Sequence, residues 1–219
     1  MIYVYGICDP SDAALALRRR GLGGATLRAL EHGGLAAVYS RHRSLQPRPL
    51  PKLVLHHERV VEAVMATGAV LPLRFGTQLE DEEQLVALLT ARHDELTRSL
   101  ERVRGKTELG VRVISVDPPG AGQADERTGR DYLLARVRAH RRHEQAIHDV
   151  HAALGALSEA SCIREPGPIP AILVAAYLVD SERVAEFRRQ ADRLAGRPAG
   201  TRMIVTGPWP PYSFATEQP

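Results

Sequence analysis

The stretch LVLHHERVVEAVMATGAVLPLRF, residues 53–75, contains a helix pattern followed at once by a strand pattern. Its aliphatic residues recur at i, i+7, i+8 and i+11, which places them on one face of a helix: Leu53, Val60, Val61 and Val64. Gly68 is expected to end this helix, and the apolar run that follows is typical of a short strand. Pro72 interrupts the run, so we expect this strand to lie at a sheet edge or a break, because proline has no N–H to donate.

Upstream of this stretch the sequence predicts a strand, a helix and two further strands. Residues 2–7, IYVYGI, are rich in strand-forming side chains, and Ser11 or Asp12 can cap a short helix after them. Residues 25–42 read as two strands around Gly33-Gly34, a plausible hairpin turn. The first 75 residues therefore have the order β-α-β-β-α-β, which is the split βαβ order of a ferredoxin-like fold.

Downstream, residues 80–104 form an amphipathic pattern that predicts one continuous helix, with Thr77 and Glu80 at the spacing of a capping box. The sequence predicts strands at 107–116, 160–165, 171–180 and 201–209, with a turn at 166–170. With helices at 132–157 and from Ser181, these elements repeat the β-α-β-β-α-β order. We therefore expect an α+β protein with two ferredoxin-like domains joined by the 80–104 helix. The predicted boundaries are 1–104, including the connecting helix, and 105–219, including the tail.

The composition is that of a globular protein, with 44% hydrophobic and 25% charged residues. The net charge of +3 is too small and too dispersed to indicate nucleic-acid binding by itself, although almost all of the cations are arginine. The sequence has no apolar run of transmembrane length and does not begin like a signal peptide, so we expect a cytoplasmic protein. Cys8 and Cys162 fit no metal motif and are expected to be buried thiols.

The first candidate site is VLPLRFGT, residues 70–77, where a cation sits between apolar neighbours next to a glycine. The functional interpretation is a corner that docks a partner or holds an anion at the start of the 80–104 helix. The alternative is a strand-to-helix turn in which Arg74 bonds backbone carbonyls. The candidate partner-binding residues here are Leu71, Pro72, Arg74, Phe75, Gly76 and Thr77.

The second candidate site is the C-terminal stretch TGPWPPYSF, residues 206–214, which is unusually rich in aromatic residues and prolines. Prolines restrict a chain to extended shapes and lower the entropy cost of docking. Its aromatic side chains can bury a large area against a partner or against their own chain. We expect Trp209 to be mostly buried and the tail to follow one extended path, with the partner site beside it. The candidate residues are Trp209, Pro210, Pro211, Tyr212 and Phe214.

Other kinds of site have little support in the sequence. His140, His143, His148 and His151 share part of one helix face, but their spacing is not that of a zinc protease helix, and a packing face is the better interpretation. Phosphate-binding glycine loops and nucleophile-elbow motifs are absent from the sequence. We therefore predict no enzyme, no metal site and no cofactor.

The two candidate segments, VLPLRFGT and TGPWPPYSF, resemble the two most distinctive motifs of the gas vesicle protein F/L family. YVYGI (3–7), GKTELGVRV (105–113) and AYLVD (176–180) are also similar to that family, in the same order along the chain. The resemblance implies a cytoplasmic, gas vesicle-associated accessory protein of vesicle assembly, with two α+β domains and no enzymatic activity. It also implies chaperone-like or scaffold-like binding of the hydrophobic shell-forming subunit and of other accessory proteins.

Two alternatives remain open from the residues alone. A ferredoxin-like RNA-binding module would suit the topology and the arginines, but the predicted strands lack the interleaved aromatics of such domains. An enzyme that binds a small anion would use Arg74 together with a helix N-terminus just after Thr77.

Overall fold

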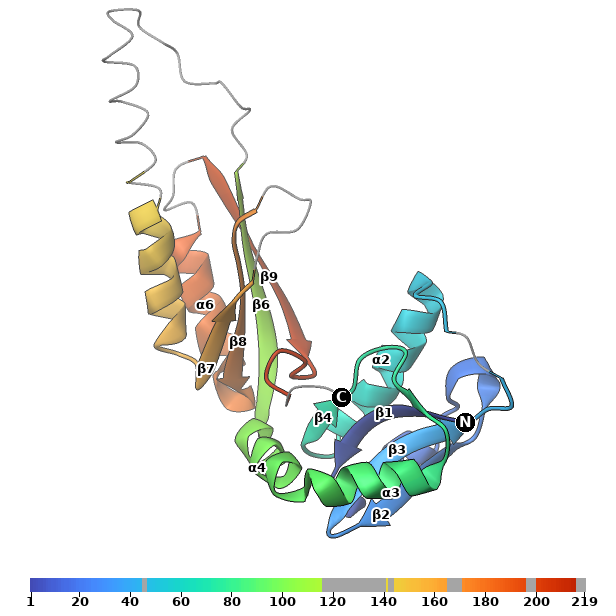
Figure 1. Ribbon diagram of the computed structural model, residues 1–219. Coiled ribbons are helices and arrows are strands. Elements are labelled where there is room, and N and C mark those ends of the chain that lie inside the picture. Colours follow the sequence, from blue (N-terminus) through green and yellow to red (C-terminus); the bar gives the residue numbers. More distant parts are fainter. Residues whose placement is uncertain (45–46, 116–140, 142–143, 165–170, 196–199, 216–219) are drawn as a thin grey trace, which may run out of the picture. The chain divides into compact units, whose positions relative to one another are not determined.

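The computed structural model describes residues 1–44, 47–115, 141, 144–164, 171–195 and 200–215, and shows a mixed fold of helices and antiparallel sheets (Figure 1). The chain forms two compact units, one made of Met1–Glu108 with Trp209–Pro219 and the other of Leu109–Pro208. The expected division at 104/105 is thus close to the first boundary. The expectation that the tail belongs to the second domain is corrected, because the tail packs with the first unit.

The first unit contains a sheet of five strands in the order β2-β3-β1-β4, with β5 also paired to β1. The strands are β1 (Ile2–Cys8), β2 (Leu27–His32), β3 (Leu35–Arg41), β4 (Val70–Pro72) and β5 (Gln78–Leu79). The helices are the short α1 (Ala14–Leu17), α2 (Pro51–Met65), α3 (Glu82–Ala91) and α4 (His93–Val103). The strand β1 is antiparallel to its neighbours β3, β4 and β5, and β2 is antiparallel to β3.

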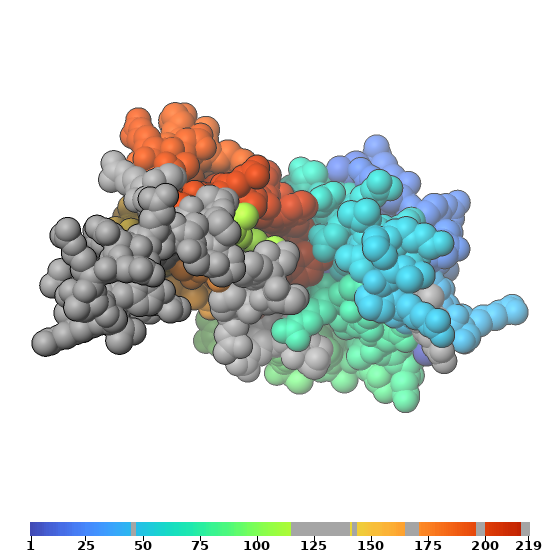
Figure 2. All heavy atoms as spheres, turned by 90° about the horizontal axis from the view of Figure 1, so that it is seen from above, coloured from blue at the N-terminus to red at the C-terminus, as the bar shows by residue number. Residues whose placement is uncertain are grey.

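All seven residues of β1 are buried, because helices cover both faces of the sheet (Figure 1). Tyr3 and Tyr5 share one core cluster with Val60, Val61 and Val64 of α2, the aliphatic stripe that the sequence predicts. The outer side of α2 faces solvent, where Leu55 is 57% exposed, and is visible in cyan in Figure 2. Strand β4 is an edge strand, as Pro72 predicts.

The predicted helix over residues 80–104 is two helices that meet at Arg92, whose backbone leaves the helical region at φ −113° and ψ 17°. The side chain of Arg92 makes a two-bond contact with Glu95, at 2.9 and 2.8 Å. α3 contacts β2 and β5, whereas α4 contacts β4. The bend therefore lets the leucines of both helices reach a twisted sheet, and the buried residues are Leu85, Leu89, Leu96, Leu100 and Val103.

The predicted capping box of Thr77 and Glu80 is also wrong. The helix begins later, at Glu82, and Asp81 is its N-cap, with its carboxylate accepting from the Gln84 N–H at 2.9 Å. The Gln84 side chain in turn accepts from the Glu80 N–H at 3.1 Å. The Gln84 side chain thus reaches past the N-cap to the residue before it, which is a variant of the capping box, and the Asp-x-x-Gln spacing is present in the sequence.

The second unit has a four-stranded sheet in the order β7-β8-β6-β9. Its elements are β6 (Lys106–Ser115), β7 (Ala160–Ile163), β8 (Ala171–Asp180), α6 (Val184–Leu194) and β9 (Thr201–Trp209), and residues 144–155 are helical. The helix at 144–155 and α6 lie side by side on one face of this sheet (Figure 1). Their apolar residues Val150, Leu154, Phe187 and Ala191 form the core with Tyr177. No helix in the described ranges is long and apolar enough to span a membrane.

Replacing the true N-cap tests the revised helix start. Asp81→Ala is expected to lower the free energy of unfolding by about 1 kcal/mol, because the Gln84 N–H loses its acceptor. Denaturant unfolding measures this loss. Glu83→Ala is the matched control, since Glu83 is an exposed acid of the same first turn without a capping role. Equal losses in the two variants would contradict the assignment of Asp81.

Candidate functional site

The segment 70–77 is held by a buried hydrogen-bond network centred on the Tyr3 hydroxyl. This hydroxyl accepts from the Gly76 N–H at 3.0 Å and lies 2.9 Å from Nδ1 of His57. The other ring nitrogen of His57, Nε2, lies 3.0 Å from the Leu73 carbonyl oxygen. Because a carbonyl can only accept, Nε2 carries the proton and Nδ1 accepts from Tyr3. The network therefore fixes the tautomer of His57 and ties the 73–76 turn to β1 and α2.

The network requires a neutral imidazole. Burial lowers the pKa of His57 from 6.5 to about 4, so the ring is uncharged at neutral pH. Burial also raises the pKa of the Tyr3 hydroxyl, which stays protonated and able to donate. Phe75 packs its ring edge against both groups, with centroids 6.1 Å from Tyr3 and 5.9 Å from His57. The half-buried Phe75 thus closes the network from the outside.

The candidate residues of 70–77 separate into buried and accessible sets. Leu71 and Pro72 are buried in β4, Phe75 and Thr77 are half-buried, and Arg74 and Gly76 are exposed. Gly76 has a φ of 98°, a conformation that favours glycine. The Thr77 hydroxyl and N–H both donate to the Arg74 carbonyl, at 2.8 and 3.1 Å, which closes a turn.

The anion-holding interpretation of this corner loses support, because the helix expected directly after Thr77 begins only at Glu82. The next helix starts at Glu82, and its N-terminus carries Asp81, Glu82 and Glu83, which repel an anion. The alternative of an enzyme that binds a small anion therefore keeps Arg74 but lacks the helix N-terminus that was expected beside it.

The tail is fastened to the first unit by polar contacts of its backbone. The Thr107 hydroxyl donates to the Trp209 carbonyl at 3.0 Å. The buried carboxylate of Glu108 accepts both the N–H and the hydroxyl of Ser213, at 2.7 and 2.5 Å. Beyond Trp209 the chain turns, with the N–H groups of Phe214 and Ala215 donating to the Pro211 carbonyl. The single extended path predicted for the tail is therefore wrong after Trp209.

The buried side chains of the tail are Pro210, Pro211 and Phe214, whereas Trp209 is 43% exposed. The expectation that Trp209 is mostly buried is therefore corrected. Trp209 ends strand β9, and the contact that holds it uses its carbonyl and not its indole. The tail thus packs on its own chain through its prolines and Phe214 and leaves its largest apolar side chain partly in water.

Tyr212 of the tail lies near Tyr3 and helix α2, which also hold the 70–77 turn. Its hydroxyl is buried and, within the described residues, makes no hydrogen bond of ordinary geometry. Burial, followed by the charge of Glu58, raises the pKa of Tyr212, and Tyr3 contributes further. Glu58 is the neighbour of His57 on α2. The two motifs, about 130 residues apart in sequence, therefore meet around Tyr3 and α2.

Five residues of this site were not predicted from the sequence as site residues: Tyr3, His57, Glu58, Glu108 and Ser213. A signal for His57 was present, because it lies four residues after Leu53 and three before Val60, on the buried stripe of the helix. Glu108 likewise interrupts an apolar strand between Thr107 and Leu109. Polar groups at positions that the pattern buries need hydrogen-bond partners, and these partners come from distant segments.

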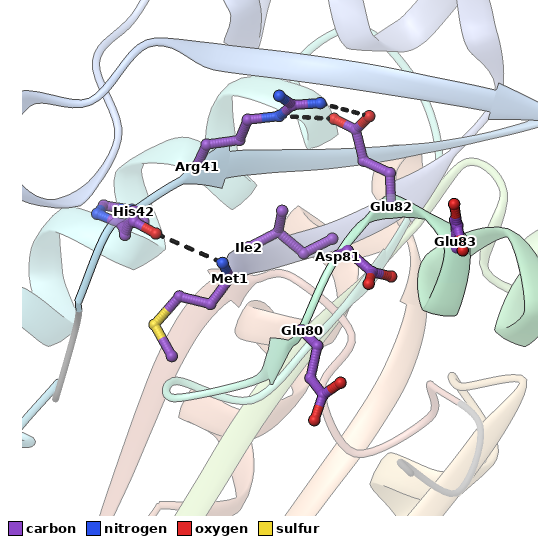
Figure 3. Close-up of a pocket in the computed structure, with 8 residues that line it drawn as sticks. All are labelled: Met1, Ile2, Arg41, His42, Glu80, Asp81, Glu82 and Glu83. Carbon is purple, nitrogen blue, oxygen red and sulfur yellow. Dashed lines mark hydrogen bonds and ion pairs between the residues drawn. The ribbon is translucent and has the colours of Figure 1, made fainter.

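A separate pocket of about 390 Å³ lies where β1, β3 and the start of α3 meet (Figure 3). The Arg41 guanidinium makes two contacts with Glu82 there, Nε to Oε1 at 2.9 Å and NH2 to Oε2 at 2.6 Å. Tyr39 also donates to Glu82, and the bonds from Arg41 and Tyr39 lower the pKa of that carboxyl. The pocket's cation is thus already paired with one of its acids. The lining residues are Met1, Ile2, Arg41, His42, Glu80, Asp81, Glu82 and Glu83.

The histidines and cysteines show no metal site among the described residues. His148 is exposed, and the half-buried His151 bonds the Tyr177 hydroxyl at 2.7 Å, which suits the expected packing role. His140 and His143 lie outside the described residues. Cys8 is buried as predicted, and burial raises the pKa of its thiol to about 12, whereas Cys162 is only partly buried.

The comparison with protein families decides the identity of the chain. Residues 1–216 match the family described as "Gas vesicle synthesis protein GvpL/GvpF". The chain belongs to this GvpL/GvpF family. The family is one of gas vesicle proteins and is not a known enzyme family. Both motifs that suggested the resemblance lie within the matched residues.

Curated relatives carry both family names. The chain is 34% identical to gas vesicle protein L of Streptomyces sp. (strain CB03234), covering 97% of this chain and 92% of the relative. It is 30% identical to gas vesicle protein F2 of Halobacterium salinarum, covering 97% and 91%. These relatives give the chain a role in gas vesicle formation.

Solved structures of GvpF share the fold. The crystal structure of GvpF from Anabaena sp. PCC7120 matches with a TM-score of 0.84 at 22% identity, over 100% of this chain and 97% of that chain. GvpF from Microcystis aeruginosa matches with a TM-score of 0.78 at 20% identity, over 99% of each chain. The mixed fold with antiparallel sheets is therefore that of GvpF.

The buried imidazole predicts a specific loss of stability in acid. Below pH 6.5 the unfolded chain protonates His57, but the folded chain does not until about pH 4. Stability therefore falls as the pH falls through this window, by roughly 3 kcal/mol from this one group. His57→Gln should be less stable at neutral pH but should show a flatter dependence between these two values.

Denaturant unfolding across that range measures the effect, and His148→Gln, at an exposed histidine, is the control that keeps the wild-type slope. An NMR titration of His57 in the wild-type protein tests the same point independently of the variant. A pKa near 6.5 there would contradict the buried, neutral network.

The hydrogen bonds between Glu108 and Ser213 predict the effect of a second substitution. Glu108→Gln keeps the shape of the side chain but loses the charge and one acceptor, so we expect a loss of about 1–3 kcal/mol of stability and faster proteolysis of the tail. Ser213→Ala, which keeps the backbone N–H, should lose less. Trp209, the only tryptophan, reports release of the tail by its fluorescence. If the tail resists proteolysis in Glu108→Gln as well as in the wild type, the hydrogen bonds of Glu108 do not hold the tail.

Proposed function

We propose that this protein binds the hydrophobic shell-forming subunit of the gas vesicle and keeps its apolar surfaces from self-association before assembly. The observation that carries the proposal is the 43% exposure of Trp209 within a motif in which Pro210, Pro211 and Phe214 are buried. A partly exposed tryptophan on a rigid backbone is a favourable contact residue, because it offers a large apolar area at little entropic cost. Membership of a gas vesicle family supports an apolar vesicle protein as the occupant.

The proposed contact residues are the accessible members of the two motifs, Trp209, Arg74 and Phe75. The buried members hold these side chains in place and contribute no contact area of their own; they are Leu71, Pro72, Pro210, Pro211 and Phe214. Gly76, Thr77 and Tyr212 shape the turn and the tail, as their hydrogen bonds and burial indicate. Docking on a preformed surface of this kind would leave the shell subunit free to be released during assembly.

We further propose that both units are ferredoxin-like and that the protein acts in the cytoplasm, associated with gas vesicles and with other vesicle accessory proteins. Strand order β2-β3-β1-β4 after β-α-β-β-α-β supports this description for the first unit, and β7-β8-β6-β9 supports it for the second. The RNA-binding alternative gains no support from the first sheet, because Tyr3 and Tyr5 are fully buried and cannot stack on bases.

Co-expression with the shell subunit tests the proposal. The wild-type protein should raise the soluble fraction of that subunit and be recovered with it. Trp209→Ala should weaken this effect at a cost of about 2 kcal/mol of stability, less than for a fully buried aromatic residue, because the side chain is partly exposed already. Leu55→Ala is the control, since Leu55 is another exposed apolar residue, 57% exposed, outside both motifs. A subunit that stays insoluble with the wild-type protein, with no complex recovered, would overturn the proposal.

A further inference from the structure

A groove in the second unit has the features of a helix-binding site, and it lies outside both motifs. It has a volume of about 470 Å³ and runs between the 144–155 helix and α6. Its lining residues are Ala153, Leu157, Glu186, Arg189, Gln190 and Arg193. None of these residues belongs to the tail or to the 70–77 turn, so the groove needs an explanation of its own.

One wall of the groove is a polar stripe of α6. Its four residues follow the spacing i, i+3, i+4 and i+7, which places them on one face over two turns, about 10 Å of helix. The buried face of the same helix is formed by Phe187, Ala191 and Leu194, which pack in the core. The stripe is therefore the flank of α6 that turns toward the neighbouring helix at the surface.

The arginines of this wall form no close ion pair among the described residues. Arg189 and Arg193 are both exposed, and Glu186 is paired with Arg183, at 3.0 Å. Arg183 and, to a lesser degree, Arg189 lower the pKa of Glu186. The wall therefore presents two exposed guanidinium groups one helical turn apart, the spacing that two carboxylates at i and i+4 of another helix would match.

The opposite wall of the groove is formed by apolar side chains, one of them small. Of the 144–157 segment, the small Ala153 and the half-buried Leu157 line the groove, and a Cβ atom built on the nearby Gly155 would meet no other atom within 4 Å. Small residues let the backbone of another helix approach closely, and the half-buried Leu157 gives this wall an apolar contact. Charge on one side and apolar surface on the other are complementary to an amphipathic helix.

We propose that this groove binds an acidic amphipathic helix of a partner protein, with its carboxylates on Arg189 and Arg193 and its apolar side on Ala153 and Leu157. A nucleic-acid backbone fits less well, because Glu186 lies in the lining and the other wall is apolar. The groove is short, so the contact is expected to be weak and readily reversible. The proposal does not rest on the tail site.

A labelled peptide tests the groove in the full-length protein. The probe is an alanine- and leucine-based helical peptide of about 16 residues with glutamates at i and i+4 on one face. Fluorescence anisotropy at low salt should show binding to the wild-type protein. A scrambled peptide of the same composition, with its glutamates spread around the helix, should bind at least about tenfold more weakly.

Protein variants separate charge from shape. Arg189→Glu combined with Arg193→Glu should weaken binding by roughly tenfold or more, and should instead favour a peptide with lysines in place of the glutamates. Gln190→Trp should block the groove without a change of charge. Arg202→Glu is the control, because Arg202 is an exposed arginine of the same unit outside the groove. Thermal melting checks that each variant is folded.

Three outcomes would overturn the proposal. They are equal affinity for the glutamate and the scrambled peptide, unchanged binding after reversal of both arginines, and tighter binding of a short single-stranded RNA that displaces the peptide. Trp209→Ala should leave peptide binding unchanged, so failure of the groove and failure of the tail site are distinguishable. A folded double-arginine variant that still co-purifies with the shell subunit would fit both proposals.

Discussion

The structure of the first unit depends on one neutral, buried imidazole. His57 is the only side chain of α2 that bonds both to the first strand and to the turn after β4, through Tyr3 and the Leu73 carbonyl, within the described residues. An apolar residue at this position would leave the Tyr3 hydroxyl and the carbonyl without these partners, which costs more than the burial it gains. The path of the 73–77 turn, and with it the exposure of Arg74 and Phe75, follows from this constraint.

The same region receives the end of the chain. The tail leaves strand β9 and is held by Thr107 and Glu108, at the point where β6 begins. Residues next to the link between the two units in sequence thus also hold the tail at Trp209 and Ser213, and Tyr212 lies near Glu58 on α2. Polar contacts to the backbone define the path of the tail, so its side chains need not all be buried. This explains how a tail can be firmly packed and still present Trp209 to a partner.

The two units offer partners different kinds of surface. The first presents a partly exposed aromatic next to a rigid, hydrogen-bonded turn, which suits an apolar protein surface. The second presents a groove with Arg189 and Arg193 on one wall and Ala153 and Leu157 on the other. Under the two proposals above, one surface would bind the shell subunit and the other an acidic helix of a partner protein. Each surface can be changed without touching the core of the other unit.

The sequence by itself determined the element order, the buried stripe of α2, the edge position of Pro72 and the family, because periodicity and local motifs are properties of neighbouring residues. It did not determine the break at Arg92 or the start of α3 at Glu82. Both depend on how a helix follows a twisted sheet, and the Asp81 cap could be recognised only once that start was known. Tertiary structure likewise decided three further features: the exposure of Trp209, the role of His57 and the hydrogen bonds of Glu108 to Ser213. Composition could show that the tail is apolar, but which side chain is covered depends on hydrogen bonds between segments about 100 residues apart.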